Sequence, residues 1–583
     1  MWFLLGLIAF VGLDLATEGM AFSWSPSILL GFVGIGEIVV LTLWDRVRWS
    51  LSSWFKVVLQ AWSSWGQWFL LVLIVGIGFC LRTYDLGFID LMADENTSFD
   101  TIRGILHKGV PEPASHIWYT RGPAYHYMVA LWLRLVGDSA VNARFLSVLW
   151  GTASLVLVFI FTREITGIGV ALAVVAILTI NPWALMMSRI IRFYQVLQFM
   201  IILSFWLFFK GFVERKGRVY QYGFFIALTF AMLNQEVTLT LLPCFLIGFL
   251  FFYRPFYWSV DWPIVLSSLM SMVIFIYDLI FFSIKCLTPW VALSDSTDSY
   301  IKFHLSDVTG FISSLCIGAN RMHTIYSCFF LLGFVYFVKR QDGKIVFLFS
   351  SVLINLIVMT VLLYQTAPRY TYPIYPIFIL LAVYSAVSII NSLCWREELK
   401  LEGLLPLRNI AVGFLVLLLI GNIEPGRVLA GYQDAINKRN TEVFEYIRDY
   451  RQPGDIVVSA TPFPAAIVMG GLDYFLLPAF RTPGTAFDTV YWREGRVIDR
   501  YAGGVVITNV DQMNHVLEKA NRVWLNIDDS KLESQAIEPA TANYFQTLGQ
   551  PIMESFGTRL RLWQREDGLL PRVPNQGRDL GAY

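Results

Sequence analysis

Residues 66–96 read GQWFLLVLIVGIGFCLRTYDLGFIDLMADEN. The first part of this stretch, up to about Leu86, is apolar and long enough to cross the hydrocarbon core of a bilayer as a helix. Two adjacent carboxylates, Asp94 and Glu95, follow where that helix would leave the membrane. Ionised carboxyl groups are costly at such a place unless water or a reaction uses them. We therefore expect a site where this helix meets water.

The composition predicts an α-helical polytopic membrane protein. The chain has 583 residues, of which 56% are hydrophobic and 15% are charged, whereas soluble domains carry about 25% charged residues. The net charge of +1 and the lack of a basic tract indicate no nucleic-acid partner. Runs of about 20 apolar residues predict about 13 membrane helices, near 1–17, 25–44, 66–86, 145–163, 168–187, 193–210, 220–235, 239–253, 264–284, 311–337, 345–364, 372–393 and 409–421.

The distribution of Lys and Arg among the short loops predicts the orientation of the chain. With the N-terminus inside, most of these residues fall in cytoplasmic loops, so Asp94 and the residues after about 430 lie on the extracytoplasmic side. We expect a cell-membrane protein, most simply of a bacterial inner membrane, whose first apolar run is a retained helix and not a signal peptide. Its three expected parts are two extra helices and a cytoplasmic loop (1–65), a catalytic core (66–429) and an extracytoplasmic α/β domain with a flexible tail (430–583).

Two regions outside the long apolar runs have their own patterns. Within an outer loop at 87–144, residues 123–136 are apolar and aromatic but too short to span, so a helix along the membrane surface is expected there. After residue 430, hydrophilic helices and short strands replace the apolar runs. The clearest of these are helices at 440–450 and 511–520 and strands at 454–459, 504–509, 522–526 and 560–564.

Asp94 and Glu95 are the first candidates for chemistry. One carboxylate could take the proton of an acceptor hydroxyl while its neighbour binds substrate or a divalent metal ion. The alternative is a pair of carboxylates that cap a helix or are solvated in a loop. Their position ahead of an aromatic interfacial segment is what favours the catalytic interpretation.

Arginines on the extracytoplasmic side form the second group. Arg189 and Arg192 lie in SRIIRFY, and Arg369 lies between Pro368 and Pro373. The planar guanidinium group suits a lipid phosphate, although arginines also extend to ordinary lipid headgroups. Further candidates for substrate contacts are ionisable residues that are equally compatible with solvated loops or an interfacial turn: His107, His116, Arg121 and Glu236.

The order of these motifs resembles the C-type glycosyltransferase superfamily, in particular its protein O-mannosyltransferase and lipid A aminoarabinose transferase branch. The resemblance covers roughly residues 66–393. The segments that carry it are Asp94-Glu95, Gly122-Pro123, Asn142-Ala143-Arg144, Asn181-Pro182 with Ser188 to Arg192, Leu233 to Glu236, and Arg369-Tyr370 with Pro373 and Pro376.

The resemblance implies an enzyme that moves a sugar from a polyprenyl-phosphate donor to an extracytoplasmic hydroxyl by inverting displacement. It implies that Asp94 is the base and Glu95 its partner. It also implies that Arg189, Arg192 and Arg369 hold the leaving phosphate, with Tyr370 beside it. A metal ion is optional in this reaction. Tyr194 and Gln195 stand where some relatives carry an acidic residue, and Glu236 stands where many carry a lysine.

Other classes of membrane protein remain open from the sequence. A lipid-linked glycan flippase or transporter would more often show an inverted repeat and charges near the bilayer midplane, and the sequence shows neither. A polymer ligase and a partner-binding module are further alternatives. Membrane lipids are expected partners in every case. The acceptor, whether lipid, glycan or protein, and the sugar are not specified by these motifs.

Overall fold

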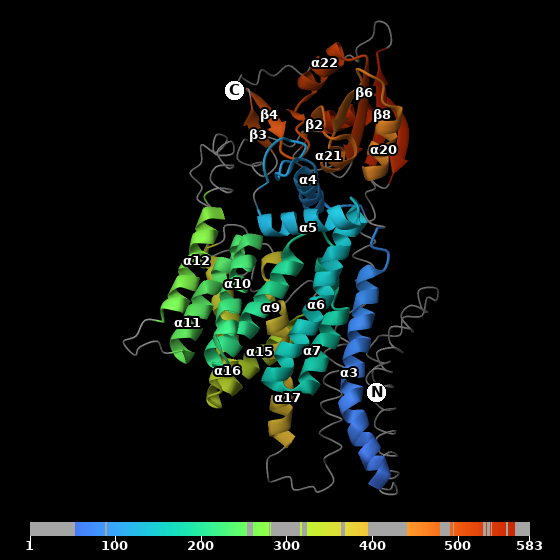
Figure 1. Ribbon diagram of the computed structural model, residues 1–583. Helices are drawn as coiled ribbons and strands as arrows, with labels where there is room; N and C mark the ends of the chain where they lie inside the picture. Colours follow the sequence, from blue (N-terminus) through green and yellow to red (C-terminus); the bar gives the residue numbers. More distant parts are fainter. Residues whose placement is uncertain are drawn as a thin grey trace. The chain divides into compact units, whose positions relative to one another are not determined.

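The computed structural model describes residues 53–87, 90–119, 121–253, 261–278, 280, 315–316, 323–362, 368–394, 440–477, 490–493, 495–528, 532, 537, 539–555 and 558–565. The chain divides into two compact units. The helical unit contains the described residues of 53–87 and 121–394. The α/β unit contains the described residues of 90–119 and 440–565. Figure 1 shows the course of the chain through both.

Helices make up the whole of the helical unit. Five of the described helical segments are long and apolar enough to cross a membrane. The unit consists of α3 (Ser53–Thr83), α5 (Pro123–Val136), α6 (Ala140–Thr166), α7 (Ile168–Ile180), α8 (Pro182–Ser188), α9 (Tyr194–Phe208), η1 (Phe209–Val213), α10 (Arg218–Asn234), η2 (Glu236–Leu241), α11 (Leu242–Phe252), α12 (Trp262–Asp278), α15 (Thr324–Lys339), α16 (Gly343–Leu362), η6 (Pro368–Tyr370), η7 (Tyr372–Ile374) and α17 (Tyr375–Cys394).

The expected number of about 13 membrane helices is not reached among the residues described. The spans are Gly66–Thr83, Ala140–Thr166, Tyr194–Val213, Gly343–Val361 and Tyr372–Ser392, and a sixth results if the bent pair α7 and α8 counts as one. The other described apolar helices, Glu236–Phe252, Trp262–Asp278 and Thr324–Lys339, have at most 17 residues. The expected helices near 1–17, 25–44 and 409–421 lie outside the described residues.

Local chemistry accounts for the two breaks in these helices. Between α7 and α8 the axis bends by 66°, because Pro182 has no N–H to continue the helix and Asn181 caps the next one, its Oδ1 accepting from Ala184 N at 3.0 Å. A second break follows α10, which ends at Asn234 before Gln235 adopts an extended backbone. The helices expected near 220–235 and 239–253 are therefore separate elements.

Helix α5 covers the residues that the sequence predicted to form a short helix. It contacts α6 and α10, and Figure 1 shows it running across the ends of these longer helices. Tyr125, Val129 and Leu133 are buried on one face, whereas Leu131 and Leu135 are exposed on the other. An apolar exposed face on a transverse helix is typical of an interfacial helix.

An eight-stranded sheet forms the centre of the α/β unit. The strand order is β3-β4-β5-β2-β1-β6-β8-β7. The four central strands β5, β2, β1 and β6 pair in parallel, whereas β4 and β3 on one side and β8 and β7 on the other pair antiparallel with their neighbours. The strands are β1 (Ile456–Ser459), β2 (Tyr474–Leu476), β3 (Val490–Arg493), β4 (Arg496–Asp499), β5 (Val505–Ile507), β6 (Arg522–Asp528), β7 (Gln550–Ser555) and β8 (Thr558–Gln564). The helices are α4 (Ala93–Lys108), α20 (Asn440–Tyr450), α21 (Phe463–Met469), α22 (Val510–Lys519) and α24 (Pro539–Thr547).

Both faces of this sheet are buried, because neighbouring residues of a strand point to opposite faces. Val457 and Trp524 pack with α20 and α21 on one face. Val458 and Leu525 pack with α22 and α24 on the other. The C-terminal region therefore has its own core, as expected for a separate α/β domain.

Helix α4 belongs to the α/β unit, although the sequence placed residues 87–144 with the membrane core. Asp90 Oδ2 accepts from Thr441 N at 3.0 Å, and Arg103 Nη1 donates to Ile467 O at 3.2 Å. Helix α4 also packs on α21. These contacts join segments more than 350 positions apart in the chain, which a local pattern does not reveal.

Candidate active site

The paired carboxylates Asp94 and Glu95 lie in the first turn of α4. Glu95 is 1% exposed and its Oε2 accepts from Met92 N at 3.1 Å, so it caps the start of its own helix. Asp94 is half-buried. A negative charge in this first turn is also favoured by the helix dipole. The two neighbours thus have different surroundings, one folded back on the backbone and one closer to the surface.

The turn before α4 is held in place by one amide side chain. Asn96 is buried, and its Nδ2 donates to Leu91 O at 2.7 Å and to Met92 O at 3.2 Å. Such bonds fix the backbone that carries Asp94. His107, at the other end of α4, is exposed. It lies about 20 Å along the helix axis from Asp94, at 1.5 Å per residue, so the two do not share a site within this helix.

In the helical unit, three of the sequence motifs meet at Gly122. Its φ of +66° is left-handed and starts α5. A Cβ at this position would lie 2.8 Å from the carbonyl oxygen of Asn234 and 2.9 Å from the ring of Phe193. The start of α5, the turn before α9 and the end of α10 are therefore in contact at a position where only glycine fits.

Arg192 lies at this junction. It is 5% exposed, and its guanidinium carbon lies 4.9 Å from the ring centre of Phe193 and 5.9 Å from that of Tyr194. The neighbouring His126 is also buried, with Nδ1 2.8 Å from Gly122 O. Burial, together with the charge of Arg192, lowers the pKa of His126 to about 3. The imidazole is therefore neutral at physiological pH, and of these two side chains only Arg192 carries a positive charge.

Arg189 has a different position from Arg192. It is 7% exposed, and it donates from Nη1 to Leu81 O at 2.9 Å and from Nη2 to Asp85 O at 3.4 Å. These carbonyls lie at the end of α3, where the helix leaves oxygen atoms without an internal donor. Arg189 thus connects the α8–α9 turn to the end of α3.

Arg369 and Tyr370 form the short helix η6 and are both half-buried, with the guanidinium carbon 5.9 Å from the ring centre. Two hydrogen bonds of Tyr372 connect this segment to α9. Tyr372 Oη donates to Gln195 Oε1 at 2.7 Å, and Gln198 Nε2 donates to Tyr372 O at 3.1 Å. The late arginine motif is thereby anchored to α9 at Gln195, which follows Arg192 by three residues in the sequence.

A buried polar and aromatic group next to these motifs was not predicted. Trp183 packs against Tyr372 and Tyr375 with ring centres 5.4 and 5.1 Å apart. Tyr375 Oη accepts from Asn181 Nδ2 at 2.9 Å and lies 3.1 Å from His323 Nε2. Asn181 belonged to a motif noted in the sequence, whereas His323 follows no recognisable pattern.

Arg82 is a further residue that the motifs missed. It is 1% exposed and donates to Gly78 O at 3.0 Å, Leu178 O at 3.3 Å and Thr179 O at 3.4 Å. The last two carbonyls belong to the final turn of α7. An ionisable side chain inside the apolar stretch of α3 was the signal that could have identified it.

The remaining candidates are more exposed. Arg121 is exposed directly before Gly122, and Glu236 is half-buried at the start of η2. His116 is exposed, and its Nδ1 lies 2.7 Å from Glu112 Oε1. Among the described residues, no three His, Cys, Asp or Glu side chains are grouped as ligands for a metal ion.

Comparisons with known proteins agree with this fold. Residues 120–281, less than half of the chain, match the family model described as dolichyl-phosphate-mannose-protein mannosyltransferase. The structure of ArnT from Cupriavidus metallidurans in the apo state matches with a TM-score of 0.57 at 12% identity, over 86% of this chain and 98% of that one. The same enzyme bound to undecaprenyl phosphate matches with a TM-score of 0.57 at 12% identity, over 84% and 97%. No curated protein matches the chain by sequence.

These matches confirm the resemblance that the sequence motifs indicated. The matching family model describes a mannosyltransferase, and the expected enzyme class is confirmed with it. The matched stretch, 120–281, falls in the helical unit and contains Arg189, Arg192 and Glu236. The apolar helices and this fold make the chain a membrane protein with a C-terminal sheet region.

Proposed function

We propose that the protein transfers a sugar from a polyprenyl-phosphate donor to a hydroxyl group of an extracytoplasmic acceptor. The proposal rests on the junction at Gly122, where Arg192 is buried next to a neutral His126. A buried guanidinium group suits the phosphate of a lipid. One of the structures with the same fold was determined with undecaprenyl phosphate bound.

Arg189, Arg192 and Arg369, with Tyr370, are proposed to bind the phosphate of the donor. They come from two segments that the Tyr372–Gln195 hydrogen bond ties together. Arg189 has backbone partners at the end of α3, so we assign it the positioning of the turn in addition to a charge contribution. Arg121, exposed at the start of α5, and Glu236 are proposed to contact the sugar or the acceptor.

Asp94 is proposed as the general base. It removes the proton of the acceptor hydroxyl, whose oxygen attacks the anomeric carbon from the face opposite the phosphate. The bond between that carbon and the phosphate oxygen breaks with its electron pair, and the arginines stabilise the charge that the phosphate gains. The anomeric configuration inverts. Glu95 stabilises the turn that carries Asp94, and a divalent metal ion is optional for these steps.

The test uses the full chain in lipid nanodiscs with radiolabelled polyprenyl-phosphate sugars and a membrane extract as acceptor. We expect label to move to an acceptor. Asp94→Asn should reduce turnover by about 10²–10⁴-fold, with the unfolding temperature and donor affinity unchanged. Asp449→Asn, the same change at an exposed carboxylate of α20, serves as the matched control. Parental turnover in Asp94→Asn would refute the role of the base.

Donor binding is measured separately from transfer. Arg369→Ala should weaken binding of the polyprenyl-phosphate sugar, whereas Arg134→Ala, an exposed arginine of α5, should not. Equal donor affinity in both variants contradicts a phosphate-binding role for Arg369. Passage of the lipid across the bilayer without transfer would instead indicate a flippase, and transfer of preassembled polymer would indicate a ligase.

A further inference from the structure

A cavity of about 360 Å³ opens within the α/β unit, between the loop after α4 and the beginnings of the parallel strands. Its lining includes His116, Arg451, Met469, Leu472, Asp473 and Ile498. All of these residues belong to one compact unit. Ligand pockets of proteins range from about 300 to 1,000 Å³, so this cavity has room for a small ligand.

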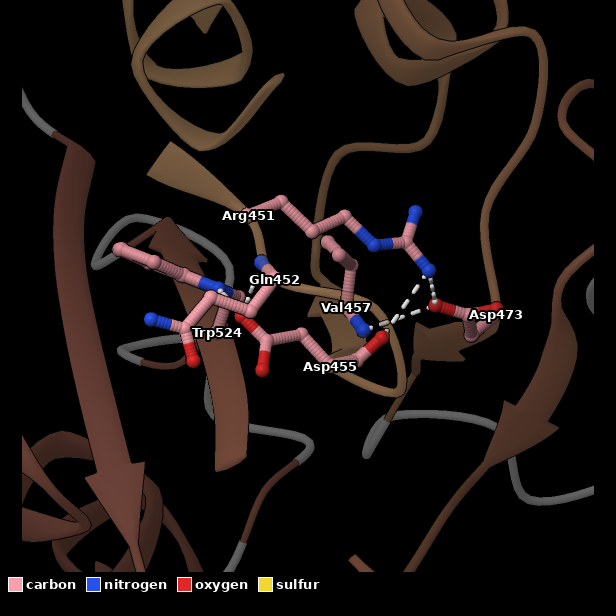
Figure 2. Close-up of polar contacts among 6 residues, drawn as sticks. All are labelled: Arg451, Gln452, Asp455, Val457, Asp473 and Trp524. Atoms are coloured by element: carbon pink, nitrogen blue, oxygen red, sulfur yellow. Dashed lines mark hydrogen bonds and ion pairs between the residues drawn. The ribbon is translucent and has the colours of Figure 1, made fainter. Parts of the chain in front are cut away.

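An ion pair with unused hydrogen-bonding atoms lies in this cavity. Asp473 Oδ2 accepts from Val457 N at 2.9 Å and from Arg451 Nη2 at 3.2 Å, and the same Nη2 donates to Asp455 O at 3.0 Å (Figure 2). Within the described part of the chain, Arg451 Nε and Nη1 and Asp473 Oδ1 have no hydrogen-bond partner. The pair thus keeps both donors and an acceptor for a ligand.

Buried neighbours fix the backbone that carries this pair. Asp455 is 5% exposed, and its Oδ2 accepts from Trp524 Nε1 at 2.8 Å and from Gln452 N at 3.0 Å (Figure 2). The side chains of Arg451 and Asp473 are 37% and 40% exposed. Exposed ion pairs add little to stability, so a rigidly mounted pair in a cavity is better explained by binding than by folding.

The lining of the cavity also includes a strained histidine. His116 has a φ of +61°, which is unusual for a residue other than glycine. The Nδ1 atom is held by Glu112, and Nε2 has no hydrogen-bond partner among the described residues. The loop that carries His116 is also fixed by Asp100 Oδ2, which accepts from Ala114 N at 2.8 Å. Strain at a well-anchored loop commonly marks a functional position.

The chemistry of the lining selects the class of ligand. The charges of Arg451 and Asp473 cancel, which disfavours a free phosphate or a cation. Donors and acceptors instead lie close together, and hydroxyl groups can serve as both. Met469, Leu472 and Ile498 add an apolar wall, which suits the C–H face of a sugar ring.

We propose that this cavity binds a neutral saccharide unit of one or two rings, supplied by the acceptor of the transfer reaction. The assignment to the acceptor rests on the proposed function, whereas the saccharide chemistry rests on the cavity. It gives the α/β unit a role in acceptor selection. His116 thereby becomes a binding residue, and the Arg451–Asp473 pair supplies the polar contacts.

Binding is measured with the full chain in nanodiscs and a panel of neutral mono- and disaccharides of glucose, mannose and galactose. Inorganic phosphate is measured in parallel. We expect at least one saccharide to bind and phosphate not to compete. Arg451→Gln and Asp473→Asn should each weaken binding about tenfold. The matched control is Arg448→Gln, an exposed arginine of α20 outside the lining. A second variant, His116→Gly, removes the imidazole and relieves the strained φ, so it tests binding without a risk to folding.

Kinetics separate this proposal from the transfer reaction. In Arg451→Gln we expect a higher KM for the acceptor with kcat and donor affinity unchanged. A change in donor affinity instead would assign the saccharide to the donor and overturn the acceptor role. Unchanged acceptor KM in all three variants, or competition by phosphate, overturns the proposal while transfer persists. If transfer is absent but saccharide binding depends on Arg451, the cavity proposal stands and the proposed function fails.

Discussion

Arginines donate to backbone carbonyls in both the helical unit and the α/β unit, but the α/β unit also uses several carboxylates that accept from backbone amides. In the helical unit, arginines donate to backbone carbonyls at helix ends: Arg82 to the end of α7, Arg189 to the end of α3 and Arg144 to Leu86 O at 2.9 Å. In the α/β unit, carboxylates accept from backbone amides. Asp473 accepts from Val457, and Asp499 accepts from Ala502 N at 2.6 Å.

The difference follows from the surroundings of the backbone. A helix end in an apolar environment leaves carbonyls that water cannot reach, and a long arginine side chain can supply donors from a neighbouring helix. Short loops between strands leave amides that a nearby carboxylate satisfies. Charge alone therefore does not identify a catalytic residue in either unit, since Arg189 and Glu95 both have backbone partners.

The largest effect is expected from removing a helix-capping arginine. Arg82→Leu removes donors to three buried carbonyls, so the free energy of unfolding should fall by about 4 kcal/mol. Thermal unfolding of the detergent-solubilised protein measures this change. Arg134→Leu, an exposed arginine of α5, is the control and should change little. Equal unfolding temperatures for the two variants would contradict the capping role of Arg82.

A pH-dependent effect is expected from a carboxylate of the α/β unit. Burial raises the pKa of Asp100 to about 6, above the ordinary range of an aspartate side chain. The folded state therefore holds this proton more tightly than the unfolded state, and stability decreases as pH rises from about 4 to about 6. Asp100→Asn keeps an acceptor for Ala114 N and should remove this decrease, which amounts to at most about 3 kcal/mol.

The measurement for Asp100 is the difference in unfolding temperature between parent and variant across pH 4 to 8. The variant should be the more stable of the two above pH 6, and the difference should shrink toward pH 4. A difference that does not vary with pH would show that the carboxyl group is not the titrating group.

A smaller effect is expected at the junction of the sequence motifs. Gly122→Ala introduces a Cβ 2.8 Å from Asn234 O at a left-handed φ, which should cost about 2 kcal/mol. Because Arg192 lies at this junction, donor affinity should decrease as well. Gly167→Ala provides the control, since its φ is also positive but nothing lies within 4 Å of the added Cβ. Loss of donor affinity in both variants would show that the effect is not specific to the junction.

The smallest effect separates the two adjacent carboxylates. Glu95→Gln keeps an acceptor for Met92 N and loses only a charge at the start of α4, so it should cost about 0.3–1 kcal/mol in stability. Sugar transfer should remain close to the parental rate, in contrast to Asp94→Asn. A Glu95→Gln variant that is inactive but fully folded would show that Glu95, and not Asp94, is the catalytic base.

Sequence patterns predicted the elements that carry strong periodicity. The helices at 123–136 and 440–450 were predicted with the bounds that the structure has. Strands β1, β5, β6 and β8 were also expected, because each contains a short apolar run. Strands β2, β3, β4 and β7 were not expected, because these segments have too little alternation of apolar and polar residues to distinguish them from loops.

The candidate site was predictable only in part. The motifs containing Gly122, Arg192 and Asn234 were identified, but their meeting at one junction depends on contacts between distant segments. Arg82 and His323 were missed, because a single polar residue in an apolar stretch carries no spacing that reveals its partners. The role of Asp94 remains a prediction.

By itself, the sequence predicted the class of this protein: a membrane chain with glycosyltransferase motifs and a polar α/β region at its C-terminal end. Hydrophobic run length and periodicity are local properties, so they can be determined from the sequence without knowledge of the fold. Only the tertiary structure decided that α4 belongs to the α/β unit and that Arg451, Asp473 and His116 line one cavity. Each of these depends on contacts between segments far apart in the chain, and such contacts leave no periodic trace in the sequence.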